Sequence, residues 1–517
     1  MFFDVNLCFL LLVTLASGSL SHASTTKDDA NSYYVAGVVE FEPIVRHQTN
    51  VLQDLKPIED IIFQQASPEV DIIVFPEAVI MHKNFMTYIP DPVDLIIPCQ
   101  NLNYHHYLSE LSCYARSAKK YLVFNLIEKV ECNVNDTCIT NSFHRYSTNV
   151  VFDRNGTVIS KYRKTNLYYD EITLVERPII PELATFKTDF GVTFAHFICF
   201  DLMFYTPSQQ HVINGITDFV YPTSWFQELP FLTALQLHQG WSEVNDVNFL
   251  SAGANFPEDQ NSGSGIFAGK WGALEYIISG TRTRKLITAK VPKKNQKFQP
   301  TNKVSRAFNA LDIPPRVTEI VTKRDYNIDL FKTELLLPYQ LSLDTEICHN
   351  GLCCEFSIKR EQRFSAQTYL SYEYRVGAFN GAGTLQRMET TELGICAIFA
   401  CTNKELSSCG RIFPQNSGIV ANDLYFKSIE IKTQYKVKNR LLVMPSTVNG
   451  RFEPLPVDAY KVTKSQKMLN GTSCITYEMT LTKPQVDLLT FGLYGNYFVD
   501  TVWQHNSRLE FGDIGIW

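Results

Sequence analysis

Apolar and polar positions divide the first half of the chain into two alternating kinds of segment. Residues 33–41, 70–75 and 121–127 are short runs that are mostly apolar, which is typical of strands buried on both faces. Residues 104–119 instead repeat apolar side chains at helical spacing. Since strands alternate with helices, the pattern predicts an α/β domain with a largely buried sheet.

The same pattern predicts the remaining elements of this α/β domain. Further strands are expected at residues 148–153, 157–162, 192–200, 217–221 and 247–252, and further helices at residues 51–65 and 231–246. Arg154-Asn155-Gly156 separates the first two of these strands and is a hairpin signal. Pro57 falls inside one predicted helix, where proline removes a backbone donor.

The pattern changes after residue 294. A polar, proline-bearing stretch to residue 316 indicates a connection, and short β-rich segments with most of the cysteines follow from residue 339. The chain has 517 residues, more than one ordinary core accommodates. We therefore expect an α/β domain at residues 30–324 and a smaller, β-rich, disulfide-stapled domain at residues 325–517.

The N-terminus predicts a secreted, extracellular protein. Residues 7–16 form an apolar core too short to span a bilayer, and Ser21-His22-Ala23 offers small residues for cleavage. Residues 1–23 are therefore expected to be a signal peptide. No later run reaches about 20 apolar residues, so no membrane span is expected. Glycosylation acceptors fit this compartment and are expected at Asn135, Asn155 and Asn470.

Composition and charge exclude one class of binding partner. Apolar residues make up 45% and charged residues 19% of the chain, which is a normal globular balance. The net charge is −6 and the chain has no basic run, so nucleic acid is not expected as a partner. Neither composition nor pattern indicates an oligomeric state.

Thirteen cysteines fit an oxidising compartment. If Cys8 leaves with the signal peptide and Cys199 is a free nucleophile, an odd number remains, so at least one more thiol is free or pairs between chains. Cys132 and Cys138 close a short loop and are expected to pair. The spacing of the others lacks the paired CxxC motifs of a zinc site, and no metal or cofactor is expected.

A carboxylate, an amine and a thiol each follow a predicted strand. Glu77 comes after residues 70–75, Lys164 after the hairpin, and Cys199 near the end of residues 192–200. At one sheet edge, Glu77 can accept the thiol proton, and Lys164 can lower the thiol pKa and stabilise an oxyanion. The backbone N–H of Phe200 would be the second oxyanion donor. This set predicts acyl transfer to water through a thioester.

Each of these residues also has a structural interpretation. Cys199 on an apolar strand fits a small buried core residue, and Glu77 and Lys164 fit solvated charges at strand ends. A secreted binding or signalling protein without turnover is therefore the alternative to an enzyme.

Several motifs resemble one known family. Residues 75–77 (FPE), 162–168 (YRKTNLY) and 199–201 (CFD) resemble the three catalytic motifs of the nitrilase superfamily. Closer resemblance to its biotinidase and vanin (pantetheinase) branch is found at residues 148–168, 219–225, 263–266 and 348–354. The resemblance thus covers both predicted domains, from about residue 34 to the end of the chain.

The resemblance implies a four-layer αββα sandwich followed by a β-rich domain. It implies Glu77 as proton acceptor, Lys164 as proton donor and oxyanion stabiliser, and Cys199 as nucleophile. A second glutamate shortly after the lysine supports such sites, and Glu171 is our choice over the neighbouring Asp170.

The resemblance also implies an enzyme that hydrolyses linear amides, with a small-molecule amide as its partner. Pantetheine is preferred as substrate because the segment around Lys164 is closer to the vanins, and biotinyl amides are the alternative. Residues 227–231 and 255–262 are candidate pocket loops.

We expect the second domain to stabilise and frame the first without supplying a catalytic group. The adjacent Cys353 and Cys354 should pair with different partners, drawn from Cys348, Cys396 and Cys401. A loop of this domain that closes over the Cys199 pocket is the alternative.

Overall fold

The fold is described from a computed structural model. It describes residues 32–43, 51–79, 86–132, 143–169, 171–294, 320–363, 370–385, 388–414, 420, 422–437, 440–469 and 472–498. The predicted signal peptide, Asn135, Cys138, Asp170 and Asn470 lie outside these residues. Asn155 lies within them and is exposed in the turn between two strands.

Two six-stranded sheets form the first domain. The first has the order β13-β1-β2-β3-β4-β5 and consists of β1 (Tyr33–Phe41), β2 (Ile72–Val74), β3 (Tyr121–Glu131), β4 (Phe143–Phe152), β5 (Val158–Arg163) and β13 (Arg284–Pro292). The second has the order β12-β11-β10-β8-β7-β6 and consists of β6 (Thr185–Lys187), β7 (Thr193–His196), β8 (Asp218–Thr223), β10 (Asn248–Gly253), β11 (Ser264–Ala268) and β12 (Ala273–Ile277). The central strands β1-β2-β3 and β7-β8-β10 are parallel.

Apolar side chains on both faces of β1 explain its almost unbroken apolar sequence. Ala36 and Val38 pack into the core between the two sheets, whereas Val39 and Phe41 pack into the core under the outer helices. Because successive strand residues point to opposite faces, a strand covered on both sides needs apolar residues at every position.

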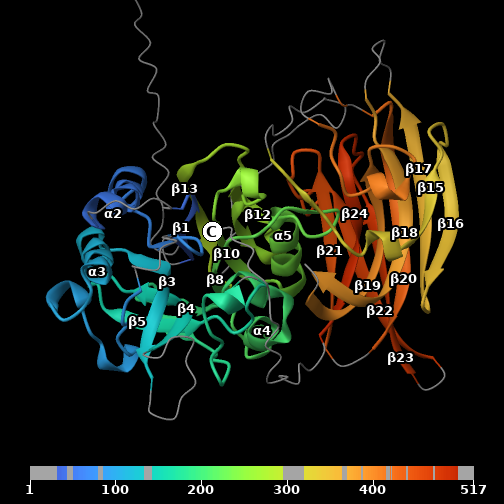
Figure 1. The fold of residues 1–517 in the computed structure, drawn as a ribbon. Helices are drawn as coiled ribbons and strands as arrows, with labels where there is room; N and C mark the ends of the chain where they lie inside the picture. The colour runs from blue at the N-terminus through green and yellow to red at the C-terminus, as the bar shows by residue number, and fades with distance from the viewer. Residues whose placement is uncertain are drawn as a thin grey trace, which may run out of the picture.

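Helices cover the outer faces of both sheets. The outer core of the first sheet includes residues of α2 (Val51–Asp60) and α3 (His106–Ala118), and that of the second includes residues of α5 (Ala234–Asn245). Figure 1 shows α2 and α3 on the side away from the second domain and α5 facing it. Together with the sheets, these helices give the predicted four-layer αββα order. The predicted helix at residues 51–65 continues past α2 as a π-helical turn, Ile61–Gln65.

The strand that precedes Cys199 is shorter than the sequence predicts. β7 ends at His196, and Cys199 begins a 3-10 turn, Cys199–Met203. Cys199 has a φ of +44°, which takes the backbone out of the extended conformation. The apolar pair Phe197 and Ile198 is buried in this connection rather than in the strand.

The second domain is a sandwich of two antiparallel five-stranded sheets. One has the order β15-β18-β19-β24-β21, with β15 (Lys332–Leu336), β18 (Glu373–Leu385), β19 (Met388–Cys401), β24 (Leu488–Tyr497) and β21 (Leu441–Asn449). The other has the order β16-β17-β20-β23-β22, with β16 (Ser342–His349), β17 (Leu352–Gln362), β20 (Leu424–Lys436), β23 (Thr472–Leu481) and β22 (Tyr460–Leu469). Buried and more exposed residues alternate along β17, as expected for sheets with one covered face.

Four disulfides join described cysteines. They are Cys99–Cys113, Cys348–Cys353, Cys354–Cys396 and Cys401–Cys409. The prediction that the adjacent cysteines pair with different partners is confirmed. Cys199 and Cys474 are free and buried, which gives the second free thiol that the odd count required. Cys132 is disulfide-bonded, and its expected pairing with Cys138 stays a prediction.

The two domains share a buried interface on α5. Gln236 Nε2 donates to Ser446 Oγ on β21 at 2.8 Å, and a Cβ atom at Gly240 would lie 2.5 Å from the carbonyl oxygen of Pro445. Phe231 stacks on Phe331 with ring centroids 5.5 Å apart. Because α5 also packs on the second sheet, this helix lies between that sheet and the second domain.

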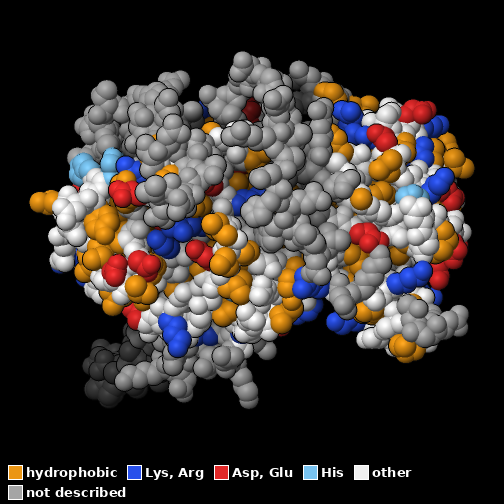
Figure 2. Space-filling view, turned by 60° about the horizontal axis from the view of Figure 1, so that its bottom comes forward, with side chains coloured by type: hydrophobic (Ala, Val, Ile, Leu, Met, Phe, Trp, Pro, Cys, Tyr) orange, Lys and Arg blue, Asp and Glu red, His pale blue; other side chains and the backbone are white. Residues whose placement is uncertain are grey.

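Charged side chains are dispersed on the face shown in Figure 2, where Lys and Arg lie among Asp and Glu. Among the described residues, no helix combines the length and the apolarity needed to cross a bilayer.

Candidate active site

The three predicted residues lie together in the first domain. Glu77 follows β2, Lys164 follows β5, and Cys199 follows β7. Lys164 Nζ donates to Glu77 Oε1 at 2.7 Å, and both charges act on the pKa of the Cys199 thiol. Strand ends from both sheets therefore bring the carboxylate, amine and thiol to one place, although they are far apart in the sequence.

Glu77 is held by the backbone of the opposite sheet. Its side chain is buried, and Oε2 accepts a hydrogen bond from the backbone N–H of Ser224, just beyond β8, at 3.0 Å. The next residue, Ala78, has a φ of +56°, and its N–H donates to Asn125 Oδ1 at 3.1 Å. These contacts fix the carboxylate with one oxygen on Lys164.

Glu171 is the second carboxylate on Lys164. Both of its oxygens lie 2.7 Å from Lys164 Nζ, and Oε2 also accepts from the backbone N–H of Tyr168 at 2.6 Å. The sequence choice of Glu171 thus names a residue that contacts the lysine. Burial raises the pKa of Glu171 to about 7, although the charge of Lys164 lowers it.

Lys164 is almost fully enclosed, with 1% of the side chain exposed. Burial lowers the pKa of the ammonium, but the charges of Glu171 and Glu77 raise it, and the net pKa lies well above the ordinary value. Lys164 is therefore a fixed positive charge at neutral pH.

The Cys199 thiol is protonated at rest. Burial raises its pKa well above the ordinary value, and Glu77 and Glu171 raise it further. Lys164 and a hydrogen bond with Thr223 lower the pKa, as the sequence predicts for the lysine, but burial outweighs them. The expectation of a thiol with a lowered pKa is therefore wrong, and a base must take the proton as sulfur attacks.

Asp201 joins the turn that carries Cys199 to the loop that carries Lys164. The sequence analysis did not predict this role. Its Oδ2 accepts from the Ile198 N–H at 3.0 Å and from Tyr162 Oη at 2.8 Å. Its Oδ1 accepts from the N–H and from Nδ2 of Asn166, each at 2.8 Å. Burial raises the pKa of Asp201 to about 6. The available signal was its place directly after Cys199-Phe200.

A tyrosine fixes the carbonyl side of the same turn. Tyr221 Oη donates to the Cys199 carbonyl oxygen at 2.7 Å. The Phe200 ring packs edge-on against Tyr168, with centroids 5.2 Å apart. The assignment of the Phe200 N–H as an oxyanion donor stays a prediction.

One pocket opens beside Cys199, and its wall is mostly aromatic or apolar. It is lined by Tyr168, Cys199, Phe200, Ser224, Trp225, Phe226, Glu228 and Leu232. The predicted loop at residues 227–231 thus contributes a lining residue. The predicted loop at residues 255–262 does not line the pocket but contacts a residue that does, because Asn261 Nδ2 donates to the Ser224 carbonyl at 2.9 Å.

No described residue of the second domain lines this pocket. A group of potential metal ligands among the described residues, Glu346, Cys348 and Cys353, lies on the second domain. The two cysteines form a disulfide with each other, so the group offers no thiolate for a metal.

Comparisons with known proteins match both domains. Residues 36–229 match the carbon-nitrogen hydrolase family, and residues 320–501 match the vanin C-terminal domain. The chain is 37% identical to vanin-like protein 2 of Drosophila melanogaster over 98% of this chain and 95% of the relative. It is 35% identical to vanin-like protein 1 of the same organism, over 95% and 89% respectively. It is 30% identical to pantetheinase of Canis lupus familiaris, over 78% of each chain.

Proposed function

The chain belongs to the vanin branch of the carbon-nitrogen hydrolases in the nitrilase superfamily, and on that premise we propose that it hydrolyses a linear secondary amide through a Cys199 thioester. The observation that carries the proposal is Lys164, held at 2.7 Å from Glu77 beside a buried thiol. A buried ammonium between two carboxylates is costly to maintain for stability alone, and this arrangement matches an acyl-transfer site.

Glu77 moves the protons in the proposed mechanism. As sulfur attacks the substrate carbonyl carbon, Glu77 accepts the thiol proton. The C–N bond then breaks, and Glu77 returns that proton to the leaving amine. Next, Glu77 takes a proton from water as its oxygen attacks the thioester carbon. When the C–S bond breaks, the proton returns to sulfur and the acid is released.

Lys164 stabilises the oxygen anion of both tetrahedral intermediates. Its charge is fixed before substrate arrives, so little reorganisation is needed when negative charge develops. Glu171 also holds the ammonium, with both of its oxygens 2.7 Å from Lys164 Nζ. The apolar pocket wall excludes water and strengthens these electrostatic interactions.

Pantetheine is the proposed substrate, with pantothenate and cysteamine as products. Support comes from the relative named pantetheinase, at 30% identity, and from the vanin C-terminal match. The test is to assay pantetheine and biotinyl-lysine side by side with purified protein, and to measure released cysteamine and biotin.

We expect pantetheine to be hydrolysed with the higher kcat/KM. A preference for biotinyl-lysine would reverse the substrate assignment and keep the mechanism. Turnover of neither, and of no member of a wider amide panel, would overturn the proposal in favour of a binding protein that retains the fold.

We propose that the protein acts outside the cell. Four disulfides between described cysteines support an oxidising compartment. Expression in a eukaryotic secretory host should place the protein in the medium, cleaved after residue 23 and carrying a glycan at Asn155. Retention in the cytosol of that host with an intact N-terminus would contradict this.

A further inference from the structure

The pocket beside Cys199 contains one carboxyl group that the mechanism does not use. Glu228 begins the short strand β9 (Glu228–Leu229), is 2% exposed and lines the same pocket as the thiol. Its Oε1 is buried and has no hydrogen-bond partner among the described residues. An unsatisfied buried oxygen is costly to the fold, so its place in a pocket wall calls for a functional reason.

Backbone hydrogen bonds, which do not involve the carboxyl group of Glu228, hold the strand around this residue in place. Its N–H donates to the Leu232 carbonyl at 3.3 Å, and the Leu232 N–H donates back to the Glu228 carbonyl at 2.9 Å. β9 also pairs in parallel with β14 (Lys323–Arg324), and the Asp325 N–H donates to the Leu229 carbonyl at 2.8 Å. The side chain can therefore change while the strand keeps its place.

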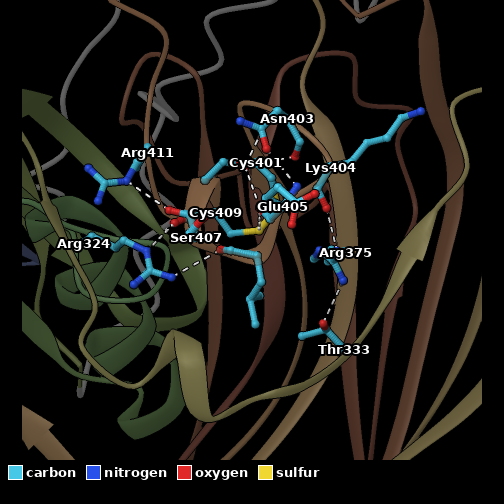
Figure 3. Close-up of a disulfide and its surroundings, with 12 residues drawn as sticks. Arg324, Thr333, Arg375, Cys401, Asn403, Lys404, Glu405, Ser407, Cys409 and Arg411 are labelled. Atoms are coloured by element: carbon cyan, nitrogen blue, oxygen red, sulfur yellow. Dashed lines mark hydrogen bonds between the residues drawn. A yellow bond between two sulfur atoms is a disulfide. The ribbon is translucent and has the colours of Figure 1, made fainter.

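A disulfide-closed loop of the second domain fixes β14 in turn. Arg324 donates to the carbonyl oxygens of Cys409 at 3.0 Å and Leu406 at 3.2 Å, within the loop closed by Cys401–Cys409. Figure 3 shows Arg324 and Arg411 on one side of this loop and Arg375 on the other. Through β14 and β9, the second domain positions one wall of the pocket.

The surroundings of Glu228 favour the neutral form of its carboxyl group. Burial and the charge of Asp325 raise its pKa well above the ordinary value, whereas Lys323 lowers it by less. A neutral carboxylic acid offers an O–H donor as well as an acceptor. The lining also includes the hydroxyl groups of Tyr168 and Ser224, and among the lining residues Glu228 carries the carboxyl group that a ligand could use.

We propose that Glu228 is a specificity-determining residue that hydrogen-bonds, as a neutral acid, an uncharged polar group of the substrate such as a hydroxyl or an amide carbonyl. The inference rests on the proposed function, since Glu228 would recognise the same substrate that Cys199 attacks. It assigns the pocket to amides that carry such a group near the scissile bond. Pockets with a buried polar partner reject analogues that lack the matching group.

Alkylation of Cys199 tests this inference without any amide turnover. The probes are three chloroacetamides of similar length, made from 3-aminopropan-1-ol, butylamine and propane-1,3-diamine. They end in a hydroxyl, a methyl and an ammonium group. In each reaction sulfur forms a bond to the chlorine-bearing carbon, chloride leaves, and Glu77 takes the thiol proton. Rates are measured by intact mass, with C199A as the background.

The wild-type protein should react about tenfold faster with the hydroxyl probe than with the methyl probe, the order expected for one hydrogen bond. Glu228→Gln keeps a neutral donor and should retain the preference within about threefold. Glu228→Leu should reduce it to about one. Its melting temperature should not fall, because the substitution removes an unsatisfied buried oxygen.

The matched control is Glu243→Gln. Glu243 is a buried glutamate on α5 whose carboxylate accepts from Tyr460 Oη outside the pocket lining. The control should leave all three rate ratios unchanged.

Equal wild-type rates for the hydroxyl and methyl probes, including no reaction with either, would overturn the inference. So would a preference that survives in Glu228→Leu. An ammonium preference that is lost in Glu228→Gln would show an ionised carboxylate and contradict the neutral acid. Failure of the proposed function is measured separately, as no turnover of pantetheine, of biotinyl-lysine or of any member of the wider amide panel.

Discussion

The two domains bury polar and reactive groups in different ways. The first places Lys164 Nζ 2.7 Å from a carboxylate oxygen of both Glu77 and Glu171, and all three charges act on the free thiol of Cys199. The second packs an apolar core between two sheets and uses most of its cysteines as disulfides. Buried charges require mutual compensation and seldom add net stability, whereas disulfides stabilise by restricting the unfolded chain. The difference separates a domain organised for chemistry from one organised for stability.

One of the contacts between the two domains leads to the pocket wall. β9, which carries Glu228 in the pocket wall, pairs with β14, which Arg324 ties to the disulfide-closed loop of the second domain. The second domain thus contacts a strand next to the pocket wall, while the described pocket lining comes from the first domain. The expectation that it frames the site stays a prediction.

The largest difference in kcat is expected between variants of the two free thiols. Among the described residues each domain contains one, Cys199 in the first and Cys474 in the second, and both are buried. Cys199→Ala should lower kcat for pantetheine by about 10⁴-fold or more, because the covalent path is lost. Cys474→Ala, the matched control, should change kcat less than about twofold. Steady-state kinetics check both, and comparable losses in the two variants would abolish the proposed contrast.

Two buried aspartates of the first domain allow a residue that contacts the site to be compared with one that supports only the fold. Asp201→Asn places an amide NH2 against two of the four N–H or O–H donors that contact Asp201, so it should lower kcat/KM by about tenfold or more and the free energy of unfolding by about 1–3 kcal/mol. Asp218 is also buried, and accepts from Tyr34 Oη at 2.9 Å and Asn248 Nδ2 at 2.7 Å. Asp218→Asn should reduce stability while kcat/KM of the folded protein stays within about threefold.

Urea unfolding and kinetics on the same preparations separate the two effects of these variants. If Asp201→Asn loses only stability, then Asp201 serves the fold and does not position the thiol-bearing turn.

The pH profile tests Glu171. Burial raises the pKa of this carboxyl to about 7, so it is ionised above that pH and takes up a proton as the pH falls through it. Protonation removes one of the two anionic partners of Lys164, and wild-type kcat/KM should therefore fall below about pH 7. Glu171→Gln should show a lower plateau, by about tenfold, without this acid limb between pH 6 and 8. An unchanged limb in the variant would assign the titration to another group.

The smallest effect on catalysis is expected from the second domain. Replacing both Cys354 and Cys396 with alanine removes a disulfide between residues 42 positions apart. This should lower the free energy of unfolding by about 2–4 kcal/mol and leave kcat/KM of the folded protein unchanged. Denaturant unfolding and kinetics provide the measurements. A changed ratio of pantetheine to biotinyl-lysine turnover would favour the alternative, in which the second domain controls the pocket.

Local pattern was enough to predict much of the fold. The strand at residues 33–41 is observed as β1, because an apolar run of that length between polar segments has few other buried conformations. The pattern failed at residues 192–200, where β7 ends at His196. Phe197 and Ile198 are buried in a turn, and an apolar sequence alone does not distinguish a buried strand from a buried connection.

The site was predictable where motif and strand end coincide, and not where the role depends on distant contacts. Glu77, Lys164 and Cys199 each follow a strand in recognisable sequence. Asp201 acts through Asn166 and Tyr162, and the position of Glu228 in the pocket wall depends on β14. Such roles arise only when the chain folds, because the contacting residues are far apart in the sequence.

Mass spectrometry of an acid-quenched reaction tests the thioester at Cys199 most directly. Wild-type protein mixed with pantetheine and quenched within the first turnover should contain a peptide with Cys199 increased by the mass of the pantothenoyl group. Hydroxylamine should remove this adduct, and Cys199→Ala should not form it. Release of cysteamine without any adduct on Cys199, at quench times that span the first turnover, would contradict the covalent mechanism.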